Sequence, residues 1–177
     1  MTKSQPIYRG RIVDLRLEEV TLPNGVTVTL EMIHHPGAAA VVAIDGDERV
    51  TLIRQYRHAA GGFLWEIPAG TLEPGEAPAT CAARELREEA GLVAAELTSM
   101  GSILTVPGFC DERIHLFLAR QLTAAAQQLD HDEVLTVTQV ALSDALTMIR
   151  TGEIQDAKTI AGLHHAGDYL RNPQLRP

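Results

Sequence analysis

Residues 6–35 show a pattern of polar and apolar side chains that is typical of antiparallel strands. Val26–Ile33 shows the clearest period of two, and Asn24-Gly25 directly before it predicts a hairpin turn. Pro36-Gly37 then interrupts the pattern. We therefore predict a small antiparallel N-terminal sheet over residues 1–37.

Two short apolar runs begin the next part of the chain, which we predict to be the main domain over residues 38–177. They are Ala38–Ile44 and Val50–Arg54. The segment between them, Asp45-Gly46-Asp47, has the composition of a tight turn and predicts a hairpin.

The clearest helix is predicted over Pro78–Ala90, because proline suits the first turn and Gly91 suits the left-handed residue after a helix. A helical spacing of apolar residues predicts its buried stripe, which consists of Ala79, Ala82, Ala83, Leu86 and Ala90.

The remaining pattern mixes strands with helices and predicts an α/β or α+β sandwich. Strands are predicted at Ser102–Val106, Ile114–Ala119 and Val134–Ala141, and helices at Ser143–Arg150 and Asp156–Leu170. Ser143 is predicted to cap the first of these two helices.

Composition narrows the classes of partner. Fifteen Lys and Arg against 23 Asp and Glu give a net charge of −8, which argues against binding to nucleic acid or to an anionic membrane surface. Bound cations still allow a phosphate-bearing substrate. No apolar run is long enough to span a membrane, and the first residues do not form a signal peptide, so we expect a cytoplasmic protein.

Three glutamates lie within two turns of the predicted helix: Glu85, Glu88 and Glu89. One interpretation is a solvated helix in which Arg84 and Arg87 neutralise them. The other is a site for a hard cation such as Mg²⁺, which prefers carboxylate oxygens, waters and substrate phosphates.

The segment from Gly70 to Leu92 resembles the Nudix box at every fixed position. The matching residues are Gly70, Glu76, Arg84-Glu85-Leu86, Glu88-Glu89, Gly91 and Leu92. This resemblance implies an α/β/α sandwich with a mixed sheet. It also implies hydrolysis of a nucleoside diphosphate linked to another group, with Mg²⁺ or Mn²⁺ as cofactor.

The same resemblance implies roles for individual residues. Glu85 and Glu89 are the implied metal ligands, together with the backbone carbonyl of Ala69. Glu88 is an additional catalytic carboxylate, and Arg84 orients the glutamates. Glu76 is a supporting acid in the loop before the helix.

Outside the box, the chain resembles the ADP-ribose pyrophosphatase subfamily. The similar segments are Arg54-Gln55-Tyr56-Arg57, Trp65 to Gly70, Val106-Pro107-Gly108-Phe109, and Gly152-Glu153-Ile154 with Asp156, Lys158 and Thr159. This resemblance implies a homodimer with an exchanged N-terminal sheet, and cleavage of ADP-ribose to AMP and ribose 5-phosphate. The candidate substrate-binding residues are Arg57, Glu66, Pro107 and Phe109; a guanidinium such as that of Arg57 binds phosphate in a bidentate manner.

A catalytic base is expected in the acidic run Asp130–Glu133, where Glu133 is the candidate and Glu112 is a second one. Two other functions stay open. In the first, the protein is a similar dimer that hydrolyses another nucleoside diphosphate sugar such as GDP-mannose. In the second, it binds ADP-ribose without hydrolysing it and acts as a sensor.

Overall fold

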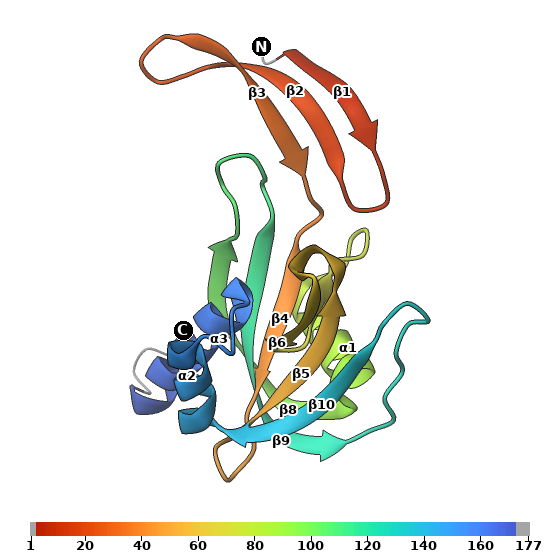
Figure 1. The fold of residues 1–177 in the computed structure, drawn as a ribbon, viewed down its shortest axis with the longest axis vertical. Helices are drawn as coiled ribbons and strands as arrows, with labels where there is room; N and C mark the ends of the chain where they lie inside the picture. The colour runs from red at the N-terminus through yellow and green to blue at the C-terminus, as the bar shows by residue number, and fades with distance from the viewer. Residues whose placement is uncertain (1–2, 173–177) are drawn as a thin grey trace.

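The computed structural model describes residues 3–172, and its first three strands form a sheet that projects from the rest of the molecule (Figure 1). β1 (Lys3–Arg9), β2 (Asp14–Thr21) and β3 (Thr27–His34) pair antiparallel in that order. At the β2–β3 turn, Gly25 has a φ of 85° and the Asn24 side chain accepts a hydrogen bond from the amide of Val26. The predicted hairpin and the small N-terminal sheet are confirmed.

The main body contains two further sheets. One is mixed, in the order β7-β4-β9-β8, with β4 and β9 parallel and the other neighbours antiparallel. The other is antiparallel, in the order β10-β5-β6. The strands are β4 (Ala38–Ala43), β5 (Arg49–Arg57), β6 (Gly62–Glu66), β7 (Ala69–Thr71), β8 (Leu92–Leu104), β9 (Arg113–Ala124) and β10 (Leu135–Ala141), and a 3₁₀ helix, η1 (His58–Ala60), joins β5 to β6.

Helices cover both faces of the mixed sheet (Figure 1). α1 (Pro78–Ala90) packs on one face in a cluster that includes Val41 and Phe117. α2 (Leu142–Thr151) and α3 (Ala157–Arg171) enclose a larger cluster on the other side. The predicted α/β/α sandwich with a mixed sheet is therefore confirmed. Within residues 3–172, no helix has the length and apolar character that crossing a membrane requires.

The predicted hairpin at Asp45-Gly46-Asp47 is wrong. Ile44 and Val50 form a single antiparallel bridge, after which β4 and β5 diverge into different sheets. The segment is a turn between two sheets, and both apolar runs that it joins are buried in the same core cluster, which includes Val42 and Leu52. The left-handed residue of this turn is Glu48, with a φ of 56°.

Two other local predictions need correction. β8 begins at Leu92, ten residues before the predicted strand, because it pairs with β9 along a length that its polar and alanine-rich sequence does not reveal. Ser143 does not cap α2, since β10 runs directly into the helix and Ala141 occupies the cap position without a side-chain bond. The free amide of Leu142 instead donates to the carbonyl of Glu48.

Candidate active site

The buried face of α1 differs from the predicted alanine stripe. Ala79 and Ala83 are exposed, whereas Glu85 and Glu89 are buried, with 8% and 1% of their surface accessible. They share this face with Cys81, Ala82 and Leu86. Burying carboxylates is costly unless a partner compensates, so their position marks a functional site rather than a solvated helix surface.

Glu89 is the more perturbed of the two carboxylates. Burial raises its pKa to about 8, even though its Oε2 accepts a hydrogen bond of 2.8 Å from the backbone amide of Ala69. Burial also raises the pKa of Glu85, and Arg84 only partly opposes this. The negative charge of Glu133 raises both pKa values further, which puts Glu133 within electrostatic reach of the pair.

Gly70 lies against the carboxylate of Glu85. A Cβ atom at this position would overlap both carboxylate oxygens and the carbon between them. Only a residue without a side chain leaves the carboxylate in its present place, which explains the glycine at the start of the box.

Arg84 joins the loop before α1 to the glutamates. Its Nε and Nη2 donate to the two oxygens of Glu76 at 3.0 and 3.1 Å. Its Nη1 donates to Glu85 at 2.6 Å and to Glu88 at 3.1 Å. The hydrogen bonds from Arg84 lower the pKa of Glu76 to about 2, so this carboxylate stays ionised. Arg84 therefore hydrogen-bonds three glutamates, and its role in orienting them stays a prediction.

The donor set fits a divalent cation. After burial, the largest cause, the negative charge of Glu85 also raises the pKa of Glu89, and a cation bound beside the two carboxylates would oppose this repulsion. Across residues 3–172, no group of three or more His, Cys, Asp or Glu side chains has the arrangement of a complete metal centre. Mg²⁺ does not need one, because it binds through one or two carboxylates and takes its other oxygens from water and substrate phosphates.

A second charged group lies next to the glutamates. The Nε and Nη2 atoms of Arg57 each donate to Glu66 at 2.9 Å, and Glu66 is only 1% exposed. The Nζ of Lys158 donates to the same carboxylate at 2.5 Å. Glu66 is thus occupied by two cations of the protein, while Arg57 remains 41% exposed at its side chain.

The other predicted residues divide between two places. Glu133 precedes β10 on the side of the glutamate pair, and its Oε2 accepts from the amide of Asp130. Pro107 and Phe109 lie in the β8–β9 turn, where the carbonyl of Phe109 accepts from the amide of Ile33 at the end of β3. Glu112 belongs to this turn as well and accepts from Thr105 Oγ1 at 2.6 Å. Of the two candidate bases, Glu133 is the one whose charge acts on Glu85 and Glu89.

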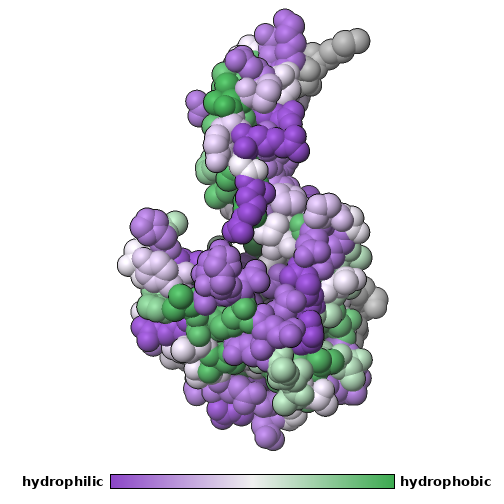
Figure 2. All heavy atoms as spheres, turned by 90° about the vertical axis from the view of Figure 1, so that its right-hand side faces the viewer, coloured by the Kyte–Doolittle hydropathy of each residue, from purple (hydrophilic) through white to green (hydrophobic). Residues whose placement is uncertain are grey.

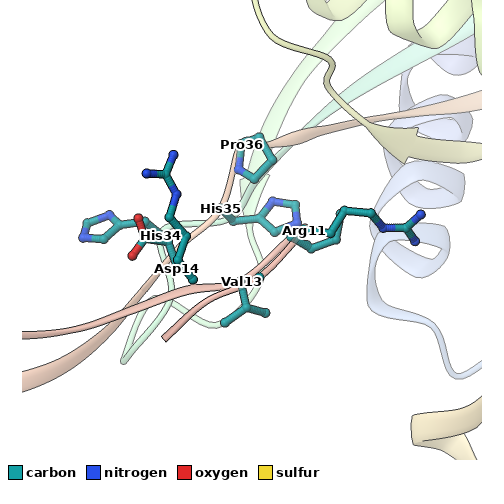
Figure 3. Close-up of a pocket in the computed structure, with 9 residues that line it drawn as sticks. Arg11, Val13, Asp14, His34, His35 and Pro36 are labelled. Carbon is teal, nitrogen blue, oxygen red and sulfur yellow. The ribbon is translucent and has the colours of Figure 1, made fainter. Parts of the chain in front are cut away.

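A cavity of about 340 Å³ opens between the β1–β2 turn and the His34–Pro36 segment (Figure 3). It contains none of the predicted site residues. Figure 3 shows Arg11 extending away from Asp14 and His34. Its guanidinium approaches Asp132 at 3.8 Å, which links the N-terminal sheet to the loop that carries Glu133.

The chain matches a known protein family over most of its length. Residues 34–163 match the NUDIX domain, a span that contains the buried glutamates, Arg84, Arg57 and Glu133. The chain belongs to the Nudix family. Nudix hydrolases depend on divalent metal ions, in agreement with the donor set described above.

Nudix relatives cover nearly the whole chain. The ADP-ribose pyrophosphatase of Bacillus subtilis is 40% identical over 163 residues, 91% of this chain and 88% of the relative. The methanol dehydrogenase activator of Bacillus methanolicus is 40% identical over 165 residues, 92% and 89% of the two chains. GDP-mannose pyrophosphatases are also similar, that of Citrobacter koseri being 31% identical over 159 residues, 83% of each chain.

The Nudix fold itself is seen in a solved structure of an ADP compounds hydrolase. It superposes with a TM-score of 0.83 over 97% of this chain and 93% of the other, at 22% sequence identity. The superposition supports the fold, including the N-terminal sheet.

Sequence reasoning did not include Lys158 and Asp156 among the site residues of this Nudix protein. Both lie at the start of α3, 92 and 90 residues after Glu66. The segment that contains them resembles the ADP-ribose pyrophosphatase subfamily, but this resemblance did not indicate which residues they contact. Cys81, which lies in the box helix, is fully buried, and burial raises the pKa of its thiol to about 12, so it is a core residue.

Proposed function

We propose that this Nudix hydrolase cleaves the pyrophosphate of ADP-ribose with water, giving AMP and ribose 5-phosphate. The main observation behind the proposal is that two carboxylates, Glu85 and Glu89, are buried close enough to repel one another. The carboxylate of Glu85 lies against the backbone of Gly70. The similarity to an ADP-ribose pyrophosphatase over nine-tenths of the chain supports the choice of substrate.

The proposed mechanism assigns a task to each group. Glu85, Glu89 and the carbonyl of Ala69 would hold Mg²⁺, with Mn²⁺ as an alternative ion, and the ion would neutralise charge on the pyrophosphate and lower the pKa of a water. Arg84 keeps Glu85 and Glu88 in position. Glu133 accepts the proton of the attacking water as the water oxygen bonds to one phosphorus of the pyrophosphate. The bond from that phosphorus to the bridging oxygen breaks, and the other phosphate leaves with the bridging oxygen.

Substrate binding follows from charge and shape. Arg57 binds the pyrophosphate through the part of its guanidinium that Glu66 leaves free. Glu66 therefore contributes to binding indirectly, by holding Arg57. Pro107 and Phe109, at the exposed β8–β9 turn, contact the nucleoside or the terminal ribose, and the exposed ring of Phe109 offers a stacking surface.

We further infer that the protein is a homodimer through its N-terminal sheet, residues 1–37, which we treat as a unit apart from the hydrolase domain of residues 38–177. Among the described residues, none from 3 to 36 is buried, so this sheet has no core of its own. Figure 2 shows apolar side chains gathered along one side of it. A sheet of three strands needs a covered apolar face to be stable, and a second copy provides one.

The net charge of −8 argues against nucleic acid as a partner, whereas bound cations allow a small phosphate-bearing substrate. We expect the protein to act in the cytoplasm. GDP-mannose is the second candidate substrate, because GDP-mannose pyrophosphatases are among the relatives. The choice between the two depends on a few hydrogen bonds to the base.

The test is hydrolysis of a panel of ADP-ribose, GDP-mannose and other nucleotide sugars, with products identified by chromatography. Glu85→Gln removes a metal ligand and is expected to lower kcat/KM by about 10³-fold or more, since a bound metal contributes several kcal/mol to transition-state stabilisation. Titration calorimetry with Mg²⁺ reports the loss of metal binding separately. Glu96→Gln, on the exposed part of β8, is the matched control and is expected to behave as wild type.

Each outcome has a definite meaning. Rapid turnover of ADP-ribose that chelator and Glu85→Gln both abolish supports the proposal. Turnover of GDP-mannose instead would retain the site and replace the substrate. Binding of ADP-ribose without turnover of any compound would mean that the protein is a sensor.

A further inference from the structure

We propose that Lys158 and Asp156, at the start of α3, are positioning residues that hold Glu66 and, through it, the guanidinium of Arg57 in place for the pyrophosphate. This inference rests on the proposed contact between Arg57 and substrate. Neither residue belongs to the Nudix box, and neither touches the glutamate pair through a hydrogen bond in the described chain.

The four residues form a continuous chain of alternating charge, called here the charged chain: Arg57, Glu66, Lys158 and Asp156. Arg57 donates twice to Glu66 at 2.9 Å. Lys158 donates to Glu66 Oε2 at 2.5 Å and to Asp156 Oδ2 at 3.0 Å. Two cations and two carboxylates give the charged chain no net charge, so it can be buried without a counter-ion from solvent.

Glu66 is the member that most needs this arrangement. It is 1% exposed, and burial by itself raises the pKa of its carboxyl. Arg57 and Lys158 together more than offset this and leave the pKa below its usual value. Without Lys158, the buried carboxylate loses one of its two cationic partners, and the geometry that it imposes on Arg57 weakens.

The first turn of α3 fixes the position of the Lys158 backbone. Asp156 caps this helix, with its Oδ2 accepting from the amide and the hydroxyl of Thr159 at 2.9 and 2.6 Å. The same hydroxyl accepts from the amide of Ile67 at 2.9 Å, the residue after Glu66. A Cβ at Gly162 would lie 2.9 Å from Ile67, so helix and strand are in close contact. These contacts join the residue after β6 to α3 as one packed unit.

Arg57 lies between this unit and the metal site. The hydrogen bonds to Glu66 are the main cause of the raised pKa of Arg57. The negative charge of Glu89 contributes as well, which puts Arg57 within electrostatic reach of the glutamate pair. Glu66 occupies Nε and Nη2, and Nη1 makes no hydrogen bond to any described residue. The guanidinium thus has one edge fixed by the charged chain and another free for a phosphate oxygen.

The test is a double-mutant cycle between Lys158→Met and Arg57→Ala, measured on the substrate that the wild type hydrolyses. Lys158→Met is expected to raise KM about tenfold, the range for a hydrogen bond between charged groups, with kcat changed less. In the Arg57→Ala background the same change is expected to add less than about twofold, because its effect passes through Arg57. Lys158→Arg, which keeps the charge, is expected to recover most of the loss.

Two further variants separate positioning from folding. Asp156→Asn keeps a cap on α3 but removes the charge that pairs with Lys158, and it is expected to raise KM in the same direction. Arg171→Met removes a cation at the other end of α3, where Arg171 pairs only with exposed Asp168 in the described chain, and it is expected to leave KM and kcat unchanged. Thermal unfolding of every variant shows whether it is folded.

A measurement that needs no substrate tests the positioning role of Lys158 separately from the proposed function. The Nε–H signal of Arg57 in an NMR spectrum, assigned by its absence from Arg57→Ala, is expected to exchange slowly in wild type and faster in Lys158→Met. Faster exchange in a protein that hydrolyses no panel compound would support the positioning role and refute the proposed function. Unchanged exchange, or additive effects of Lys158→Met and Arg57→Ala on KM, would overturn the inference.

Discussion

The carboxylate of Glu85 lies in a space that exists only because residue 70 has no side chain. A metal ligand must be held within a fraction of an ångström of its functional position. Neighbouring backbone holds it well because backbone moves less than a side chain does. Gly70 and the amide of Ala69 together fix one side of the glutamate pair.

At this scale we predict that Gly70→Ala displaces Glu85 and lowers kcat/KM by about 10²-fold, the usual effect of moving a catalytic group by about 1 Å. Calorimetric titration with Mg²⁺ is expected to show weaker binding as well. Gly46→Ala is the matched control, since a Cβ there meets no atom within 4 Å and the residue has no positive φ. Equal activities for the two variants would contradict the explanation for the glycine.

At the scale of elements, the loop before α1 is tied to the helix by the pair of hydrogen bonds between Arg84 and Glu76. Glu76 Oε2 also accepts from the amide of Glu73, which closes the loop on itself. Since this loop follows Ala69 and Gly70, we expect its position to affect the alignment of the proposed metal site. The folded protein therefore favours the ionised form of Glu76, whose pKa is lowered to about 2.

This lowered pKa predicts a pH dependence of stability. The contribution of Glu76 is fully present above the unfolded-state pKa, about 4.5, and is lost as pH falls from there toward about 2. The difference in unfolding free energy between wild type and Glu76→Gln is thus expected to be largest near neutral pH and to shrink below pH 4.5. Urea unfolding at a series of pH values measures it, with Glu96→Gln as control. A difference that does not change with pH would rule out this origin.

Local sequence predicted some elements well and others poorly, for a common reason. Pro78 and Gly91 act on their own backbone, so both ends of α1 were predicted correctly. The length of β8 depends on pairing with β9, and the start of α2 depends on the carbonyl of Glu48. Neither partner is near in sequence, which is why the predicted strand was too short and the predicted cap was wrong.

At the scale of the whole molecule, the N-terminal sheet exposes apolar side chains that a dimer would cover, including Ile7 and Tyr8 of β1. We predict that the wild type has twice the mass of one chain by light scattering, and that Ile7→Lys shifts it toward monomer at low concentration. Gln5→Lys, an exposed polar position of the same strand, is the control and is expected to stay dimeric. A wild type that is monomeric at every concentration would disprove the dimer.

The sequence by itself determined the extent of α1, because Pro78 and Gly91 act on their own backbone. The α/β/α fold and the candidate metal ligands came from the resemblance of residues 70–92 to the Nudix box, which is a pattern of residues close together in the sequence. Tertiary structure decided that α1 turns Glu85 and Glu89 inward and leaves Ala79 and Ala83 exposed. It also decided that Lys158 meets Glu66 across 92 residues. Burial and ion pairing of this kind arise only when distant segments pack together, and the helical period alone does not specify which face of a helix they cover.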